Sequence, residues 1–302
     1  MFDLAAWVQA ARPLAQINIV VPLLFGQALA FAALGRFGPG FMLLAGLFGL
    51  LVQLVIVFVN DLSDQETDLH NVTYARVSGG SRVLAQGKLS PADLRGGAIV
   101  ALGLLAVFSV GLALGGRPWM PVFAAAAVSL VWAYDRAPLR LAYRGRGELV
   151  QGLGTGVVLP LAGYYIQAGT LAGFHPWALI PLLLLGYIGN LLSALPDAPS
   201  DRVAGKRTYA VRQGQWATRL TAFALTAIAS TMSALAVPGL PLWAMVLLAA
   251  PVLAVVALAG PLVSDADAEK RAECERFVMT LAGAGHLLVL LWSAVLVLPG
   301  LP

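Results

Sequence analysis

Three carboxylates lie close together in the stretch NDLSDQETD, which spans residues 60–68. Asp61, Asp64 and Asp68 are three and four residues apart, so they share one face if the preceding helix continues through them, with Asn60 at the edge of that face. Carboxylate oxygens are ligands for Mg²⁺, which proteins hold through one or two carboxylates together with the phosphates of a substrate. The same acids could instead be solvated residues of a loop, and one motif alone does not decide between the two.

A second acidic motif, DAPSD, places Asp197 and Asp201 four residues apart. Asn190 lies two helical turns before Asp197, on about the same face. Two carboxylate clusters that face one another can bind a ligand that carries several metal ions. Neither cluster alone would suffice. We therefore predict that all five aspartates bind metal, and that Asn60 and Asn190 lie beside the ligand.

Basic side chains follow each acidic motif and indicate the charge of that ligand. Arg82 comes after the first motif, and Lys206 and Arg207 come after the second. A diphosphate bridged by Mg²⁺ ions would satisfy both the acids and these cations. Lysine and arginine are also expected in any cytoplasmic loop. The three residues are therefore candidates for diphosphate contacts only because they follow the acids in the sequence.

The elements that must position these residues are hydrophobic helices. The chain has 302 residues, of which 59% are hydrophobic and 11% charged, and its mean hydropathy is +0.83, so it has too little polar surface for a soluble globule. Nine hydrophobic runs have the length that a helix needs to cross ~30 Å of hydrocarbon, where backbone groups must bond internally. We predict an all-α integral membrane protein, a single domain over residues 1–302, with nine transmembrane helices in a bundle. The predicted spans are 14–34, 41–59, 92–113, 118–134, 149–168, 176–195, 216–236, 241–262 and 277–299.

The basic residues are distributed unequally between the two ends of these spans. Of the 19 Lys and Arg residues, all but Arg36 and Arg117 fall at the N-terminus or in the connections after the second, fourth, sixth and eighth spans. The positive-inside rule therefore predicts a cytoplasmic N-terminus and an external C-terminus. All 15 acidic residues lie on the predicted cytoplasmic side, so the two acidic motifs, four helices apart, indicate a parallel internal repeat. Residues 1–16 lack a small-residue cleavage site and are predicted to form a short interfacial helix.

The paired acidic motifs resemble those of the UbiA-type intramembrane prenyltransferases. The segments SGGSRVLAQGKLSP, YDRAPLRLAYRGRGEL and AGKRTYAVR are similar to that family as well, and the resemblance covers nearly the whole chain. It implies Mg²⁺-dependent transfer of a prenyl group from a polyprenyl diphosphate to an aromatic acceptor, a quinone precursor such as 1,4-dihydroxy-2-naphthoate or 4-hydroxybenzoate, in a central cavity open to lipid. Gln65 departs from the pattern, because many members carry Arg there, and one possible diphosphate contact is thereby removed.

Three further residues are candidates for substrate contacts. Tyr134 could face a developing cation with its ring, although an aromatic residue at a helix end is also typical of a membrane interface. Arg140 could bind the diphosphate or a carboxylate of the acceptor. Asn18 lies in the first helix, where a buried amide is costly enough to suggest a function, and we predict that it contacts the acceptor.

Two other functions are compatible with these features. A membrane-bound terpene cyclase would use the same diphosphate site but let the cation attack its own chain. A transporter or lipid-binding protein would use the acids only to bind cations, but it would need ionisable residues along a pathway through the midplane, whereas the acids here cluster at one surface. The predicted partners are a polyprenyl diphosphate, a small aromatic acceptor and membrane lipid, without nucleic acid or an obligate protein partner. The predicted location is the inner membrane of a bacterial or archaeal cell, with the active site facing the cytoplasm.

Overall fold

Helices dominate the part of the chain that the structure describes. This computed structural model describes residues 3–69, 80–236, 240–263 and 271–298, and none of these residues forms a β-strand. Two of the basic residues counted above, Arg76 and Lys270, lie outside these ranges. The all-helical fold predicted from the hydrophobic runs is confirmed for the described residues.

Nine long helical segments occupy the described residues, near the nine predicted spans. In chain order they are α2 (Ile17–Leu34), α3 (Pro39–Ser63), α5 (Pro91–Leu114), α6 (Met120–Asp135), the joined pair α7 (Gly147–Leu153) and α8 (Leu159–Ala168), α9 (Leu179–Val203), α10 (Tyr209–Leu235), α11 (Leu242–Val263) and α12 (Arg271–Val297). The short helices α1 (Leu4–Ala11) and α4 (Gln65–Leu69) flank the first two of them. A π-helical turn over Gly154–Val158 connects α7 to α8.

Seven segments within the described residues are long and apolar enough to cross a membrane. The helix α6 has only 16 residues, and α10 carries polar residues such as Arg212 and Arg219 in its first half. An integral membrane fold with several apolar spans is therefore supported, whereas nine crossings and the orientation of the N-terminus stay predictions.

Side-chain caps and one left-handed glycine set helix ends that matter for the site. The Asp3 carboxylate accepts a hydrogen bond from the Ala6 N–H at 3.1 Å and begins α1, the predicted short N-terminal helix. Ser90 and Asp93 form a reciprocal capping box at the start of α5. At the opposite end, Gly35 adopts a φ of 64° and ends α2, as glycine can do without steric cost.

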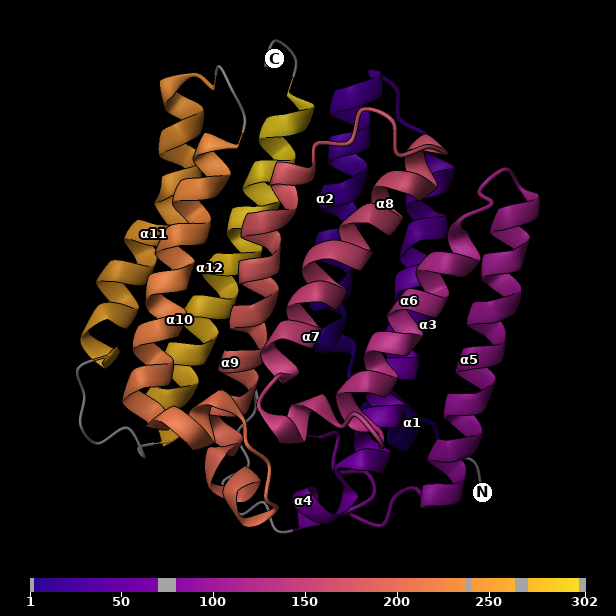
Figure 1. Cartoon of the computed structure of the whole chain (residues 1–302), viewed down its shortest axis with the longest axis vertical. Helices are drawn as coiled ribbons and strands as arrows, with labels where there is room; N and C mark the ends of the chain where they lie inside the picture. The colour runs from indigo at the N-terminus through magenta and orange to yellow at the C-terminus, as the bar shows by residue number, and fades with distance from the viewer. Residues whose placement is uncertain (1–2, 70–79, 237–239, 264–270, 299–302) are drawn as a thin grey trace.

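Close packing of α2 against α8 lies at the centre of the bundle. A Cβ on Gly26 would overlap the Pro160 carbonyl and lie 2.7 Å from the Tyr164 nitrogen, so only glycine permits this approach. On one side of the pair, α3, α5 and α6 share a cluster of buried apolar side chains, and on the other side α9, α10 and α12 share another. Figure 1 shows these two groups of helices on either side of α7 and α8.

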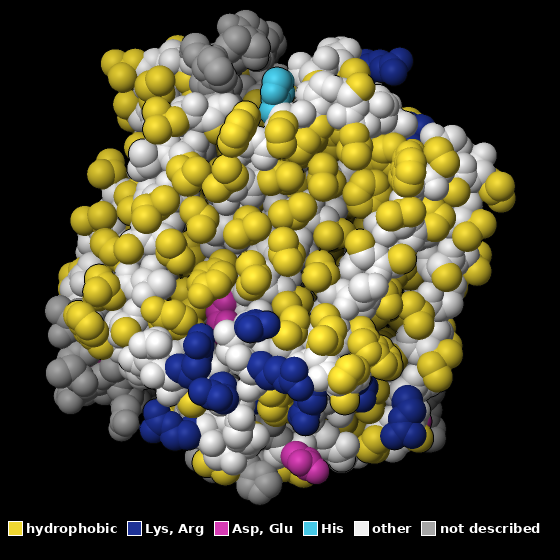
Figure 2. Space-filling model, in the orientation of Figure 1, with side chains coloured by type: hydrophobic (Ala, Val, Ile, Leu, Met, Phe, Trp, Pro, Cys, Tyr) yellow, Lys and Arg dark blue, Asp and Glu magenta, His cyan; other side chains and the backbone are white. Residues whose placement is uncertain are grey.

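The molecular surface matches a protein embedded in lipid. Large apolar side chains are exposed on the outer helices, for example Leu43, Val107 and Leu253, each with more than half of its surface accessible. Figure 2 shows hydrophobic side chains over most of one face and a band of Lys and Arg across its lower part. In Figure 1 the helix α1 and the short α4 lie at this lower end, while α12 finishes at the upper end.

Candidate active site

The two acidic motifs meet at one end of the bundle. The Asp64 N–H donates to the Asn60 carbonyl at 2.9 Å and the Asp68 N–H donates to the Asp64 carbonyl at 2.8 Å, so helical spacing continues from α3 towards α4. The helix α4 contacts α9, which carries the second motif (Figure 1). Asp61, Asp64 and Asp68 are all buried, which argues against their being solvated loop acids.

Asp61 is held from two directions. Arg12, just after α1, forms an ion pair with its carboxylate. The Ser81 N–H donates to the same carboxylate at 3.1 Å, and the Ser81 hydroxyl donates to its second oxygen. Gln9 of α1 in turn donates to the Ser81 carbonyl at 2.7 Å. The N-terminal helix therefore fixes one wall of the acidic cluster.

Asp64 is the point where the two motifs are joined. The Lys206 Nζ lies 2.7 Å from its Oδ1 and 3.8 Å from the Oδ1 of Asp201. The Tyr143 hydroxyl donates to Asp64 at 3.2 Å, and the Asn60 amide donates to it at the same distance. One ammonium group thus bridges the α3 motif and the α9 motif.

Lys206 is buried in this position, directly after α9. The backbone N–H of Lys206 donates to the backbone carbonyl of Asp201 at 2.8 Å. The preceding Gly205 has a φ of 72°, which turns the chain back towards the acids. Burial alone would lower the pKa of Lys206, but the charges of Asp64 and then of Asp201 outweigh it and raise the pKa. The ammonium is therefore firmly charged.

Asp68 lies against the backbone of Gly80. A Cβ at Gly80 would collide with the Asp68 carboxylate and lie 3.1 Å from an oxygen of Asp61, so both carboxylates crowd one point of the chain. Burial, followed by the charge of Asp64, raises the pKa of Asp68 to about 6. A cation nearby would stabilise the charged form of this buried carboxyl group.

The second motif lies inside α9, which continues through two prolines. Asp197 and Asp201 both belong to the helix, and Asp201 is buried. Pro199 cannot donate to the Leu195 carbonyl one turn before it, and the Gln215 amide of α10 donates to that oxygen instead at 2.9 Å. Thus α10 satisfies a carbonyl that Pro199 leaves without its helical partner, in the part of α9 that carries the two acids.

Three arginines beside the acids have an unusual backbone conformation. Among the described residues, Arg12, Arg82 and Arg140 are the non-glycine residues with positive φ, at 47°, 62° and 41°. Such conformations cost free energy and often occur at functional sites. The Arg140 guanidinium lies 3.9 Å from the centre of the Tyr143 ring, whose hydroxyl bonds Asp64, and Arg82 directly follows Ser81, which bonds Asp61.

The other predicted residues fall in different surroundings. The Asn190 amide donates to the Tyr134 hydroxyl at 2.8 Å and to Gln151 at 3.0 Å, so Asn190 and Tyr134 form a pair inside the bundle. The Arg207 side chain is exposed, and its backbone N–H donates to the Tyr143 carbonyl at 3.3 Å. Asn18 is exposed on α2 and contacts the His286 ring of α12 at 3.1 Å, which gives it a partner outside the acidic cluster.

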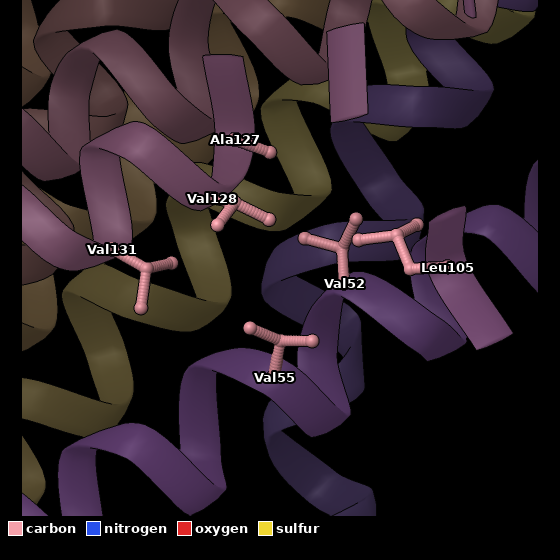
Figure 3. Close-up of a pocket in the computed structure, with 6 residues that line it drawn as sticks. All are labelled: Val52, Val55, Leu105, Ala127, Val128 and Val131. Carbon is pink, nitrogen blue, oxygen red and sulfur yellow. The ribbon is translucent and has the colours of Figure 1, made fainter. Parts of the chain in front are cut away.

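A small apolar pocket opens between α3, α5 and α6. Figure 3 shows its lining side chains around a common space, which is too narrow to hold a water molecule. Val55 precedes Asp61 by about 9 Å along α3, and Val131 precedes Asp135 by one turn, because each residue advances a helix by ~1.5 Å. The lining residues are Val52, Val55, Leu105, Ala127, Val128 and Val131.

Three residues of the site were missed by the sequence predictions. Arg12 had a signal, because it is the only charged residue between Asp3 and Arg36. Ser81 had none, since serine in a loop is common. Tyr143 stood in an arginine-rich loop, where its contact with Asp64 depends on how that loop folds back onto α3.

The oxygen ligands that the site offers can be compared with those that a metal ion requires. Among the described residues, no three acidic, histidine or cysteine side chains come together as a complete metal cage. Mg²⁺ usually takes one or two protein carboxylates and completes its shell with water and substrate phosphates. Buried aspartates that are now paired with Arg12 and Lys206 supply oxygen ligands of this kind, so the residues fit Mg²⁺.

Comparison with known proteins agrees with the motifs. The model of the UbiA prenyltransferase family matches residues 19–298. A "1,4-dihydroxy-2-naphthoate octaprenyltransferase" of Mycobacterium tuberculosis is 29% identical over 267 residues, covering 87% of this chain and 88% of its own. A "2-carboxy-1,4-naphthoquinone phytyltransferase" of Synechocystis sp. is 25% identical over 213 residues, covering 69% of this chain and 66% of its own.

A solved structure supports the fold. A UbiA homolog from Archaeoglobus fulgidus, bound to DMAPP and Mg²⁺, superposes with a TM-score of 0.68 over 94% of this chain and 98% of its own. The two sequences are 15% identical, so this similarity concerns the fold alone.

Proposed function

Because the chain belongs to the UbiA prenyltransferase family, we propose that it transfers a prenyl group from a polyprenyl diphosphate to a 1,4-dihydroxy-2-naphthoate-type quinone precursor in the membrane. The acceptor class is supported by two relatives whose names share a naphthalene-ring acceptor while their prenyl donors differ. The observation that carries the proposal is the bridge of Lys206 between Asp64 and Asp201, which brings both acidic motifs to one ligand site.

The metal ligands in this proposal are the five aspartates of the two motifs. Mg²⁺ would supply neutralisation of the charge that develops on the departing diphosphate. The residues assigned to hold it are Asp61, Asp64, Asp68, Asp197 and Asp201. Burial of four of these side chains supports the assignment, because buried carboxylates need a positive partner.

The basic residues bind the diphosphate. Lys206 lies within reach of both motifs, so its ammonium can turn from the carboxylates to a phosphate oxygen without a large movement. Arg12 pairs with Asp61, and Arg140 lies against Tyr143, which bonds Asp64. We include Arg82 because it directly follows Ser81, which bonds Asp61, and guanidinium groups match phosphate oxygens in two-point hydrogen bonds. Arg207 is a weaker member of the set, because its side chain points to the surface.

Prenyl transfer breaks the bond between the first prenyl carbon and the diphosphate oxygen. A carbon of the aromatic ring bonds to the positively charged allylic carbon as diphosphate leaves. The same ring carbon then loses its hydrogen as a proton, or its carboxylate as carbon dioxide, which restores the aromatic ring. Fixed cations beside the diphosphate lower the barrier to breaking the carbon–oxygen bond, since they are already oriented when negative charge develops on the departing diphosphate. The Tyr134 ring, held by Asn190, is the candidate to face the allylic carbon.

The prenyl chain leads into the apolar pocket between α3, α5 and α6. Its lining residues are aliphatic, and the pocket begins within two turns of Asp61 on α3 (Figure 3). The side chains leave no room for even a water molecule between them, so a prenyl chain can enter here only if these helices separate, and otherwise it extends into lipid.

The acceptor is assigned to the side of the site near Arg140. If Arg140 binds an acceptor carboxylate, its replacement by Ala raises the KM of the acceptor more than that of the diphosphate. The same test applied to Asn18 separates an acceptor contact from its pairing with His286. In the membrane we assign nine crossings, with the N-terminus and the acidic site facing the cytoplasm, on the basis of the basic residues at that end.

Purified protein tests the function directly. It is incubated with Mg²⁺ and a series of allylic diphosphates, with 1,4-dihydroxy-2-naphthoate, with 4-hydroxybenzoate, or without an acceptor, and the lipid products are identified by mass spectrometry. We expect a prenylated naphthalene product that requires both Mg²⁺ and the naphthoate. Prenylation of 4-hydroxybenzoate but not of the naphthoate would contradict the proposed acceptor class. Cyclic hydrocarbons formed without an acceptor would show that the protein is a terpene cyclase and not a prenyltransferase.

A further inference from the structure

A second pocket lies at the end of the bundle opposite the acidic motifs. It is formed by the α2–α3 connection, the α5–α6 connection and the end of α8, and its volume is about 300 Å³. The 25 residues of α3 separate it from Asp61 by roughly 30 Å along the helix. Its lining includes Arg36, Phe37, Phe41, Arg117 and Gln167.

Arg117 is fixed in the wall of this pocket. Its Nε–H donates to the Ile166 carbonyl at 2.7 Å and one Nη1–H donates to the Gly116 carbonyl at 3.1 Å. The guanidinium carbon lies 4.2 Å from the centre of the Phe41 ring. An arginine carries five N–H donors, so these two bonds orient the group and leave other donors for an acceptor.

No acidic side chain balances the two arginines of the pocket. All 15 acids of the chain belong to the other end of the predicted spans, and within the described ranges neither Arg36 nor Arg117 forms an ion pair. Burial lowers the pKa of Arg117, and the nearby charge of Arg36 lowers it too. Two cations that are close together without a carboxylate form a site for an anion.

The position of these arginines is unusual for a membrane protein. Basic residues are disfavoured in connections on the external side, yet the only two that this chain has there line one pocket. Exposed apolar side chains lie near them in the chain: Phe37, which lines the pocket, is 45% exposed, and Trp119, two residues after Arg117, is 60% exposed. The charged wall and the apolar rim together match a ligand with an anionic group and a hydrocarbon tail.

We propose that this pocket, the Arg36–Arg117 pocket, binds the phosphate group of an anionic glycerophospholipid from the leaflet at that end of the bundle. The planar guanidinium of Arg117 and the unpaired one of Arg36 bind the phosphate oxygens, as arginine does in two-point contacts. The acyl chains lie along Phe37 and the exposed faces of α2 and α3. The lipid thereby supplies the negative charge that the chain lacks at this end.

Native mass spectrometry of the full chain in detergent tests the proposal. Wild type, Arg36→Gln, Arg117→Gln and the double variant are titrated with phosphatidylglycerol and, separately, with phosphatidylcholine. The matched control is Arg95→Gln, an exposed arginine on α5 near the acidic end. We expect each pocket substitution to weaken phosphatidylglycerol binding by on the order of tenfold, the loss of one charge-assisted hydrogen bond, and the control to leave it unchanged.

Arg36→Gln is the decisive variant, because Arg36 is exposed and a glutamine there disturbs no packing. Phosphatidylglycerol binding equal to that of the control would overturn the proposal. Equal binding of phosphatidylcholine and phosphatidylglycerol by wild type would overturn the need for an anionic lipid. Displacement of phosphatidylglycerol by inorganic phosphate at equal concentration would make the pocket a site for free anions, and the lipid assignment would be wrong.

Discussion

Replacing Lys206 by methionine removes the bridge between the two acidic motifs while keeping the length of the side chain. The ammonium lies 2.7 Å from Asp64 and 3.8 Å from Asp201, distances at which the Coulomb energies are about 6 and about 4 kcal/mol for an effective dielectric constant of ~20. Desolvation of the buried ammonium offsets much of this attraction. Loss of one partner from a buried pair then costs about 3–5 kcal/mol, because the carboxylates are left without a cation.

In metal-free buffer, Lys206→Met should therefore lower the unfolding temperature by on the order of 5 °C, measured by thermal unfolding of the detergent-solubilised protein. Mg²⁺ with a non-hydrolysable diphosphate should restore more stability to the variant than it adds to wild type, since it supplies the missing positive charge. Turnover should fall by about a hundredfold, the usual effect of losing one fixed group that stabilises developing charge.

Two controls separate the bridge from a general effect of removing a lysine. Lys206→Arg keeps the charge and should keep most of the stability. Lys88→Met removes an exposed lysine whose Nζ bonds Gln9 at 2.7 Å, and exposed contacts of this kind contribute within about 0.5 kcal/mol. An unfolding temperature for Lys206→Met within the error of wild type would refute the bridge, and normal turnover would remove Lys206 from the diphosphate site.

Three further predictions follow from the same geometry. Asp64→Asn combined with Asp197→Asn should lower Mg²⁺-dependent turnover by on the order of a hundredfold or more, with the double effect smaller than the product of the single ones, and normal turnover in that variant would disprove the two-motif site. Ser81→Ala should lower turnover by about tenfold, because one donor to Asp61 is lost, while the unfolding temperature moves little; an unchanged rate would make Ser81 structural only. In a background without the native cysteine, Arg144→Cys and Thr170→Cys should react with a membrane-impermeant thiol reagent from opposite faces of the membrane, and labelling from one face would overturn the predicted topology.

The architecture was predictable because its signals are local. A hydrophobic run of about twenty residues predicts a helix whatever its neighbours are, and the paired acidic motifs indicated the family that the comparison then confirmed. The continuation of α9 to Val203, through Asp197, Asp201 and two prolines, goes beyond the predicted span 176–195. Helix content and the approximate spans could thus be predicted one segment at a time.

Contacts within the site were harder to predict because they join distant segments. The ion pair of Arg12 with Asp61 and the hydrogen bond from Tyr143 to Asp64 span 49 and 79 residues of the sequence. Asn18 is a further example, since its side-chain oxygen lies 3.1 Å from the His286 ring across the α2–α12 interface, while its predicted contact with the acceptor stays a prediction. Which polar side chains meet depends on how the helices pack, and a single sequence contains no direct record of that.

The ion pair between Lys206 and Asp64 joins residues that leave the ribosome far apart in time. About 140 residues separate them, which corresponds to on the order of ten seconds of synthesis at ~5–20 residues per second. During that interval the first acidic motif is already made, but its cationic partner does not yet exist. In the proposed mechanism, a nascent chain therefore has both acidic motifs only after α9 is made, and we expect that half-made copies in the membrane do not consume prenyl diphosphate.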